Sequence, residues 1–345
     1  MYLSAKARAV VERELIPSLT DSVLNRETTG VTETFSRDGI LAARVLPREN
    51  WHTLREQHHR ELFPLIQPHL ERAGRGEHHP VLDFLFRYYS LRPQQLLTWG
   101  PGYGAILHDA LADEFPTSLG YHSTPNGRTL DPASFPKKRL PFLEWVMRLN
   151  ATVLKRSPRF SCFGLHEWAM LYRAPKPRHT KIPLRVSPSV IAEVVTNQPL
   201  HCTHFDAFRF FTPDAVPLND TPLSREGCLT HEQPGCLHAN MDLYKWCYKL
   251  YPWVSSDLLR ASFLLALDAR ILDMEASPYD VTSLGCGAIA IESEEGKARY
   301  IESQRAIHEK AQIVRAALVA EVSMLAAALA REEQSQTVSS LAGKS

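Results

Sequence analysis

The chain has 345 residues, of which 44% are hydrophobic and 22% charged, so it can bury a sizeable core and belongs among globular proteins. No run approaches 18 consecutive apolar residues, and the first residues carry charges where a secretory signal needs an unbroken apolar region. We therefore expect a cytoplasmic protein without a membrane span. The six cysteines have no framework spacing, so we expect reduced thiols.

The charges nearly balance, with 39 Lys plus Arg against 38 Asp plus Glu, but they are unevenly spread. The segment 137–185 holds twelve basic residues against Glu144 and Glu167 alone. They are Lys137, Lys138, Arg139, Arg148, Lys155, Arg156, Arg159, Arg173, Lys176, Arg178, Lys181 and Arg185. Such a segment can bind phosphates through counterion release, which makes DNA a candidate partner. The alternative is a solvated basic face without a specific partner.

Most of the chain has the apolar spacing of helices. Helices are predicted at 48–72, 81–89, 141–156, 163–172, 188–196, 238–250, 256–276 and 294–331. Only 39–46 and 288–292 have strand patterns, and these two could pair with each other. The sequence therefore predicts a mainly α fold: a single helical catalytic domain over 1–332 that could form a bundle, with at most a small β-hairpin or two-stranded sheet. The polar residues 333–345 predict a flexible tail.

Titratable residues are crowded into otherwise apolar surroundings between Cys162 and Trp246. They are His166, Glu167, His201, His204, Asp206, Glu232, His238 and Asp242. Burying an unpaired charge or an unsatisfied imidazole costs several kcal/mol, so an ordinary core segment has no use for them. The pattern indicates one polar site, although the residues alone leave its chemistry open between two alternatives.

A metal site is the first alternative. His238 and Asp242 are four apart, which places them on one face of a helix, and His204, Glu232 and Glu167 could converge on them from other segments. Iron, manganese or zinc would suit imidazole and carboxylate ligands, in a helical oxygenase or hydrolase.

Three weaker metal patterns accompany this set. His79 and Asp83 repeat the same spacing but are more simply explained as a satisfied polar contact. Di-iron proteins pair a Glu with a His three residues later, and the helical segments contain one such pair, Glu56 and His59. The pair lies in a highly charged helix, which favours a position on the surface. A zinc site could also use CLTHEQPGCLH, through Cys228, His231, Cys236 and His238, although its spacing matches no common finger.

Hydrolysis of an N-glycosidic bond is the second alternative. One ionised carboxylate can stabilise the oxocarbenium-like transition state and orient water, and Glu167 and Asp206 are the candidates. A flipped base needs aromatic faces, which Trp168, Tyr172 and Phe208 offer, with Arg209 beside them. The alternative for each aromatic residue is ordinary core packing.

The longer motifs add a family resemblance. They are HHPVLDFLFRYY, RPQQLLTWGPGYG, FGLHEWAMLY, CTHFDAFRFFTP, EQPGCLHANMDLYKW, SPYDVTSLG and IAIESEEGKARYIESQ. Over about 46–318 the chain resembles a group of bacterial, largely actinobacterial proteins known as 3-methyladenine DNA glycosylases. The resemblance implies removal of alkylated purines from DNA without an obligatory cofactor.

One short segment bears on the type of glycosylase. GPGYGAIL at 100–107 resembles the phosphate-binding hairpin of helix-hairpin-helix glycosylases. In those enzymes a catalytic aspartate follows about 20 residues later, but here Asp109 and Asp113 come too early and Asp131 comes late. A plain Gly/Pro turn before a helix is the alternative. The sequence analysis thus ends with a DNA-base glycosylase as the leading hypothesis and a metal-dependent oxygenase or hydrolase as the other.

Overall fold

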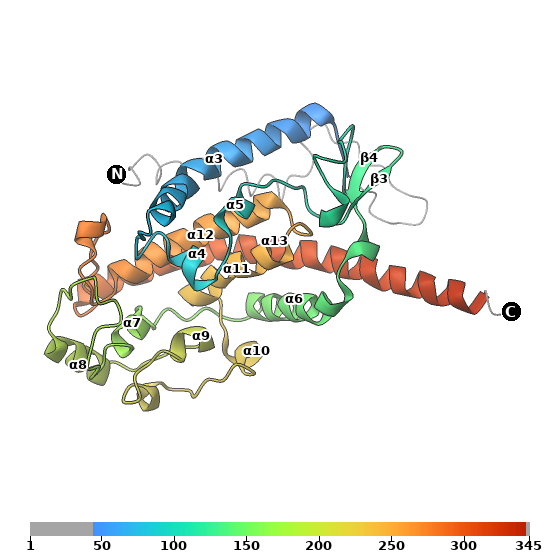
Figure 1. Ribbon diagram of the computed structural model, residues 1–345. Coiled ribbons are helices and arrows are strands. Elements are labelled where there is room, and N and C mark those ends of the chain that lie inside the picture. The colour runs from blue at the N-terminus through green and yellow to red at the C-terminus, as the bar shows by residue number, and fades with distance from the viewer. Residues whose placement is uncertain (1–43, 343–345) are drawn as a thin grey trace.

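Three long helices form the centre of the molecule: α11 (Leu237–Leu250), α12 (Ser256–Glu275) and α13 (Glu294–Ala342). The computed structural model describes residues 44–342, with side chains as far as 334. α11 packs along α12, and α13 packs against both. Figure 1 shows α13 running the length of the molecule, with its C-terminal end projecting beyond the other elements. The mainly helical fold predicted from the sequence is confirmed.

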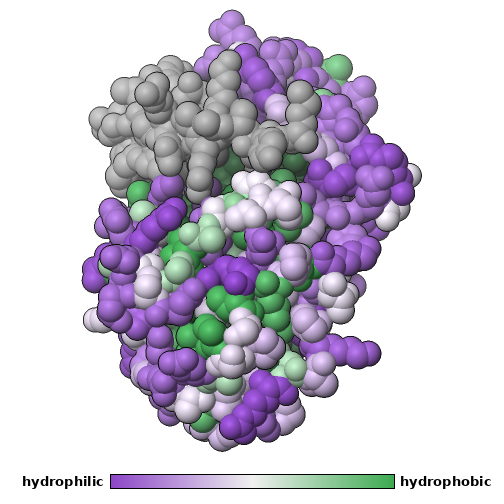
Figure 2. All heavy atoms as spheres, turned by 90° about the vertical axis from the view of Figure 1, so that its left-hand side faces the viewer, coloured by the Kyte–Doolittle hydropathy of each residue, from purple (hydrophilic) through white to green (hydrophobic). Residues whose placement is uncertain are grey.

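Shorter helices surround this centre. α3 (Arg48–Gly74), α4 (Phe84–Tyr88) and α5 (Pro93–Leu96) pack against α12, and α6 (Leu140–Leu154) packs against α13. The others are α7 (Leu165–Ala169), α8 (Pro188–Asn197), α9 (Phe205–Phe208) and α10 (Cys228–His231), which lie with long loops at the lower left in Figure 1. Figure 2 shows this end of the molecule: apolar atoms reach the surface in its middle, within a hydrophilic border.

Helix α12 is buried around almost its whole circumference, which is typical of a helix at the centre of a core. It begins where the Ser255 hydroxyl caps it by accepting a hydrogen bond from Leu258 N at 3.2 Å. Ser255 also donates from its own hydroxyl to Glu321 of α13 at 2.6 Å, which fixes the start of α12 against α13. Charged residues of α12, among them Arg270 and Asp273, are buried and therefore need partners inside the protein.

A sheet of four short strands lies at one side of the helices. The strands are β1 (Arg44–Leu46), β2 (Ala105–Leu107), β3 (Tyr121–Thr124) and β4 (Gly127–Leu130), in the order β1-β2-β4-β3, with β1 parallel to β2. Gly127 has a φ of 132°, and a Cβ there would lie 2.0 Å from the carbonyl oxygen of Leu107, so the turn into β4 requires glycine.

The sheet differs from the two-stranded one expected. The segment 288–292 forms no strand, so its predicted pairing with 39–46 is wrong; the part of that strand before residue 44 lies outside the described residues. The segment 100–107 is also not a turn between two helices, because it leads directly into β2. The first residues of the predicted domain, 1–43, lie outside the described part of the chain as well.

Helix α13 is long and apolar enough between Glu294 and Gln334 to cross a membrane, by length and composition only. Some of its polar residues are nevertheless paired within the protein. Arg315, 1% exposed, donates to the Ala239 carbonyl at 3.1 Å and to Asn240 Oδ1 at 2.8 Å. Such contacts are typical of a core helix, and a core helix can have the length and apolar composition of a membrane-spanning one. The helix continues to Ala342, into the segment predicted as a tail, and 343–345 lie outside the described residues.

Candidate functional site

Side chains from three helices meet in the interior: His166 of α7, His238 in the first turn of α11 and Asp273 near the end of α12. One potential ligand atom from each lies within 4.8 Å of the others. Imidazole nitrogen and carboxylate oxygen are common ligands of iron, manganese and zinc. This group, called here the His–His–Asp group, could therefore hold a metal ion.

His166 and Asp273 form a buried ion pair. His166 Nε2 lies 2.9 Å from Asp273 Oδ1. Neither atom has a further hydrogen-bond partner in the described part of the chain. A metal ion bound here would replace the proton that the two groups share.

Arg270 lies on the other side of Asp273 and pairs with two carboxylates. Its Nη1 is 2.6 Å from Asp273 Oδ2 and 3.1 Å from Glu167 Oε1. The guanidinium also lies 3.8 Å from the centre of the Phe84 ring. Arg270 therefore fixes one oxygen of Asp273 and leaves the other directed at His166. Glu167, predicted as a catalytic carboxylate, is buried beside this arginine.

Burial and neighbouring charges set the pKa values in this group. Burial alone would lower the pKa of His166, but the charges of Asp273 and Glu167 outweigh it and raise the pKa. For Asp273 the opposite holds: burial alone would raise the pKa, and His166 and Arg270 bring it below its usual range. Burial, with the charge of His166, holds the pKa of His238 well below its usual value. His238 is therefore neutral, with a nitrogen lone pair free for a ligand bond.

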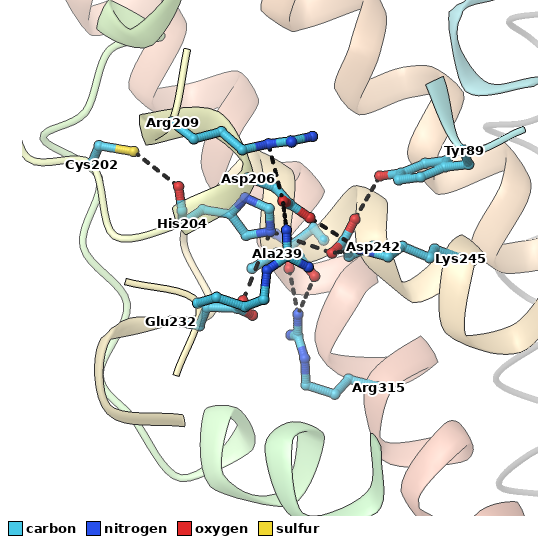
Figure 3. A network of polar contacts seen from close by, with 12 residues as sticks. Tyr89, Cys202, His204, Asp206, Arg209, Glu232, Ala239, Asp242, Lys245 and Arg315 are labelled. Carbon is cyan, nitrogen blue, oxygen red and sulfur yellow. Dashed lines mark hydrogen bonds and ion pairs between the residues drawn. The ribbon is translucent and has the colours of Figure 1, made fainter. Parts of the chain in front are cut away.

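A second polar cluster lies beside the first and is drawn in Figure 3. His204 Nε2 is 3.4 Å from Asp242 Oδ2 and 3.8 Å from Glu232 Oε1. Tyr89 donates to Asp242 Oδ1 at 2.7 Å, and Lys245 Nζ lies 2.9 Å from Asp242 Oδ2. Burial alone would raise the pKa of Asp242, but Lys245 and His204 hold it below its usual range. Burial raises the pKa of Glu232.

His238 joins the two clusters. Its ring stacks on His204, with centroids 5.5 Å apart, and meets the edge of His166 at 4.3 Å. The four residues predicted as metal ligands, His204, Glu232, His238 and Asp242, thus lie close together, but within residues 44–334 they do not form a set close enough to share an ion. Asp242 has Lys245 and Tyr89 as partners.

Asp206 connects the second cluster with the surface. Lys245 Nζ lies 3.4 Å from Asp206 Oδ2, and Arg209 Nε lies 3.2 Å from Asp206 Oδ1. The side chain of Asp206 is 22% exposed. The two predicted residues Asp206 and Arg209 are therefore neighbours at the edge of the molecule, and Glu167 is separate from them, beside Arg270.

A small cavity of about 20 Å³ adjoins the His–His–Asp group, with room for about one water molecule. Its lining includes His166 and His238, the three thiols of Cys162, Cys202 and Cys236, and Tyr300 of α13. His201, Thr203 and Gln233 also line it, and leucine and phenylalanine side chains close the remaining walls. The cavity therefore offers a guest three imidazoles, two hydroxyls, an amide and the thiols.

The aromatic residues predicted to bind substrate are core residues. Trp168 is fully buried and donates from Nε1 to the Ala276 carbonyl at 2.9 Å. Tyr172 and Phe208 are buried as well. None of the three lines the cavity. Their rings are therefore packed in the core, whereas Phe211 of the same part of the chain lines the cavity.

The weaker metal patterns are not assembled. Asp83 pairs with Arg72, Nε to Oδ2 at 2.9 Å, and with His69 at 3.0 Å, while His79 Nδ1 accepts from Leu82 N at 3.0 Å. His79 and Asp83 therefore form a satisfied structural contact.

The zinc hypothesis fails on geometry. Cys236 and His238 line the cavity, but Cys228 and His231 belong to α10 and do not. Over residues 44–334, the His–His–Asp group is the one set of three His, Cys, Asp or Glu side chains close enough to share an ion. The remaining pair, Glu56 and His59, is exposed on α3, as the sequence indicated.

The basic segment 137–185 is only partly available to a partner. Arg139 donates to the Lys249 carbonyl, Arg156 to the Leu229 carbonyl, and Arg185 pairs with Glu292. The other nine basic residues of the segment are exposed. In Figure 1 the segment follows α6 and then turns toward α7 and α8. Its charges are therefore spread along the molecule.

Sequence reasoning missed Asp273 and Arg270 as site residues. Both lie in ARILDME, three residues apart, in a helix that is buried around almost its whole circumference. A charge pair at that spacing inside such a helix must be buried, and this was the signal available. Tyr300 gave no comparable signal, because a single tyrosine in an amphipathic helix is ordinary.

Comparison with protein-family models, with curated proteins and with solved structures finds no match.

Proposed function

We propose that the protein is a metal-dependent enzyme whose divalent metal binds His166, His238 and Asp273. The observation that carries the proposal is that one ligand atom from each of these three side chains lies within 4.8 Å of the others. Two imidazoles and one carboxylate form the ligand set of many non-haem iron oxygenases, and zinc hydrolases use it as well. Iron, manganese and zinc are thus the candidate metals.

The residues around the group suit a catalytic metal site. Three protein ligands leave at least one coordination position for water or substrate, and the cavity adjoins two of the three. When bound, the metal would polarise a substrate oxygen or lower the pKa of a bound water. Arg270 orients the Asp273 carboxylate through Oδ2, and the His204 ring supports that of His238.

Metal analysis of the purified protein tests the proposal. After reconstitution with Fe(II), Mn(II) or Zn(II), the wild type should retain about one ion per chain. His238→Ala and Asp273→Asn should lose more than about 90% of it, because a site with three ligands rarely survives removal of one. His59→Ala, which removes an exposed imidazole of α3, is the matched control and should bind like the wild type. Circular dichroism confirms that each variant is folded.

Two results would contradict the proposal. One is a wild type that retains no ion under any of the three conditions. The other is folded His238→Ala protein that retains as much metal as the wild type.

A second candidate is the removal of alkylated purines from DNA, as the family resemblance implies, and a surface feature favours it. Arg178 and Arg209 lie 3.9 and 4.4 Å from the centre of the Phe210 ring, and Arg225 lies 5.6 Å from that of Phe205. We call these five residues the α9 surface. Cations interleaved with aromatic rings suit phosphates and bases together. Asp206, paired with Arg209 and Arg225, would be the carboxylate that stabilises the oxocarbenium-like state.

A base-release assay on methylated duplex DNA tests this second candidate. Wild type should liberate 3-methyladenine, and Asp206→Asn should lose release while still binding DNA, because the carboxylate acts on the transition state. Asp214→Asn is the control, because Asp214 is also an aspartate paired with an arginine. Duplex binding should also weaken steeply with salt. Wild-type protein that releases no base, or whose DNA affinity is unchanged by salt, would remove this candidate.

A further inference from the structure

The hydroxyl of Tyr300 is buried without a partner. Tyr300 is 0% exposed, and its oxygen has no hydrogen-bond partner among the side chains and backbone that the structure describes. The Cys162 thiol lies beside it, but sulfur is a weak acceptor. An unsatisfied buried hydroxyl costs about 1–3 kcal/mol. A stronger acceptor than this thiol, such as a guest molecule, would satisfy the hydroxyl.

The cavity supplies the place for that acceptor. Tyr300 lines it together with His166 and His238. The Thr203 hydroxyl, which is also buried without a partner, lines the cavity as well, whereas Tyr244, whose hydroxyl lacks one too, does not line it. The volume of about 20 Å³ suits one water-sized molecule. A guest there would have the imidazoles of the His–His–Asp group and the Tyr300 hydroxyl within the same small space.

We propose that Tyr300 donates a hydrogen bond to a single small ligand with an oxygen or nitrogen lone pair, held in this cavity at the open side of the metal. The ligand class is water, hydroxide or an anion of two or three heavy atoms. This inference rests on the proposed function, because the metal is the ligand's second anchor. Burial raises the pKa of Tyr300 well above its usual value, so the phenol keeps its proton and acts as a donor.

The size of the cavity gives the proposal a further consequence. A purine base does not fit in a space of about 20 Å³, so the molecule that reacts at the metal is small or presents only a small group. Leu165, Leu200 and Phe211 form apolar walls that offer no hydrogen bond to a larger polar guest. A guest at this site is therefore selected first by its size and second by hydrogen bonds from hydroxyls of the wall, those of Tyr300 and Thr203.

Azide binding to the Co(II)-loaded protein tests the inference. Cobalt is first measured per chain, and azide is then titrated while the visible absorption of Co(II) is recorded. We expect azide to bind the wild type, and Tyr300→Phe to bind it about 5- to 15-fold more weakly, the effect of one lost hydrogen bond. Tyr279→Phe is the matched control: Tyr279 is also buried, its hydroxyl accepts from His179 N at 3.2 Å, and it does not line the cavity.

The outcomes separate the two proposals. Wild-type protein that takes up no cobalt contradicts the proposed metal site. Full cobalt loading with equal azide affinity in the wild type and Tyr300→Phe overturns the role of Tyr300. A size series on the wild type provides a test even if Tyr300→Phe does not fold: azide should change the spectrum and benzoate should not. A response to benzoate as strong as that to azide would also overturn the inference.

Discussion

Replacing Arg270 by methionine should strongly destabilise the protein. The methionine keeps most of the apolar stem but removes the charge that lies 2.6 Å from Asp273 and 3.1 Å from Glu167. At an effective dielectric constant of about 20, each of these contacts is worth roughly 5 kcal/mol of Coulomb energy. Breaking a buried pair costs about 3–5 kcal/mol after relaxation. We therefore expect the free energy of unfolding of Arg270→Met to fall by about 3–5 kcal/mol at pH 7.5.

Urea denaturation followed by tryptophan fluorescence measures this loss. Adding Glu167→Gln to Arg270→Met should recover part of the stability, because it removes one of the two carboxylates left without a partner. Arg173→Met is the control, since Arg173 and Asp214 are both more than half exposed and their pair should contribute about 0.5 kcal/mol or less. An Arg270→Met protein within about 1 kcal/mol of the wild type, or no recovery in the double variant, would refute the reasoning.

Two further predictions follow from burial. His58 is fully buried, and burial lowers its pKa to about 4. Because the pKa in the unfolded state is about 6.5, the unfolded state takes up a proton first as the pH falls. The contribution of His58 to the free energy of unfolding is therefore full above pH 6.5 and falls by about 3 kcal/mol as the pH drops to 4. His58→Gln should flatten this slope in urea titrations at pH 4.5 and 7, and an unchanged slope would contradict the assignment. Burial also raises the pKa of the Cys202 and Cys247 thiols to about 12. Iodoacetamide at pH 8 should therefore label them far more slowly in native than in urea-unfolded protein, and mass spectrometry showing equal rates would contradict this.

Helices with a clear apolar period were predictable from the sequence. Those expected at 48–72, 188–196 and 256–276 agree with α3, α8 and α12 within two residues at each end. α8 illustrates why: Ser187 caps Val190 N, Pro188 occupies the first turn, and the apolar positions face inward. Helices α4 and α7 are shorter than expected, because their patterns continue into turns that have the same apolar spacing.

The sheet could not be predicted in the same way. Strands of three or four residues are too short to show alternation, and β1 pairs with β2 from 61 positions later in the chain, Arg44 with Ala105. The site was predictable in part. Polar residues in apolar surroundings identified His204 and His238 correctly as neighbours. Asp273 was missed because it lies in a separate apolar helix, and only the packing of α12 against α11 brings it to His238.

The central claim is that one metal ion binds between α7, α11 and α12. An anomalous-difference map from crystals of the metal-loaded protein, recorded at the absorption edge of the bound metal, tests it most directly. The claim predicts a single strong peak about 2.0–2.2 Å from a nitrogen of His166, a nitrogen of His238 and Asp273 Oδ1. A peak held by other residues, or no peak at this position in protein shown to contain the metal, would contradict it.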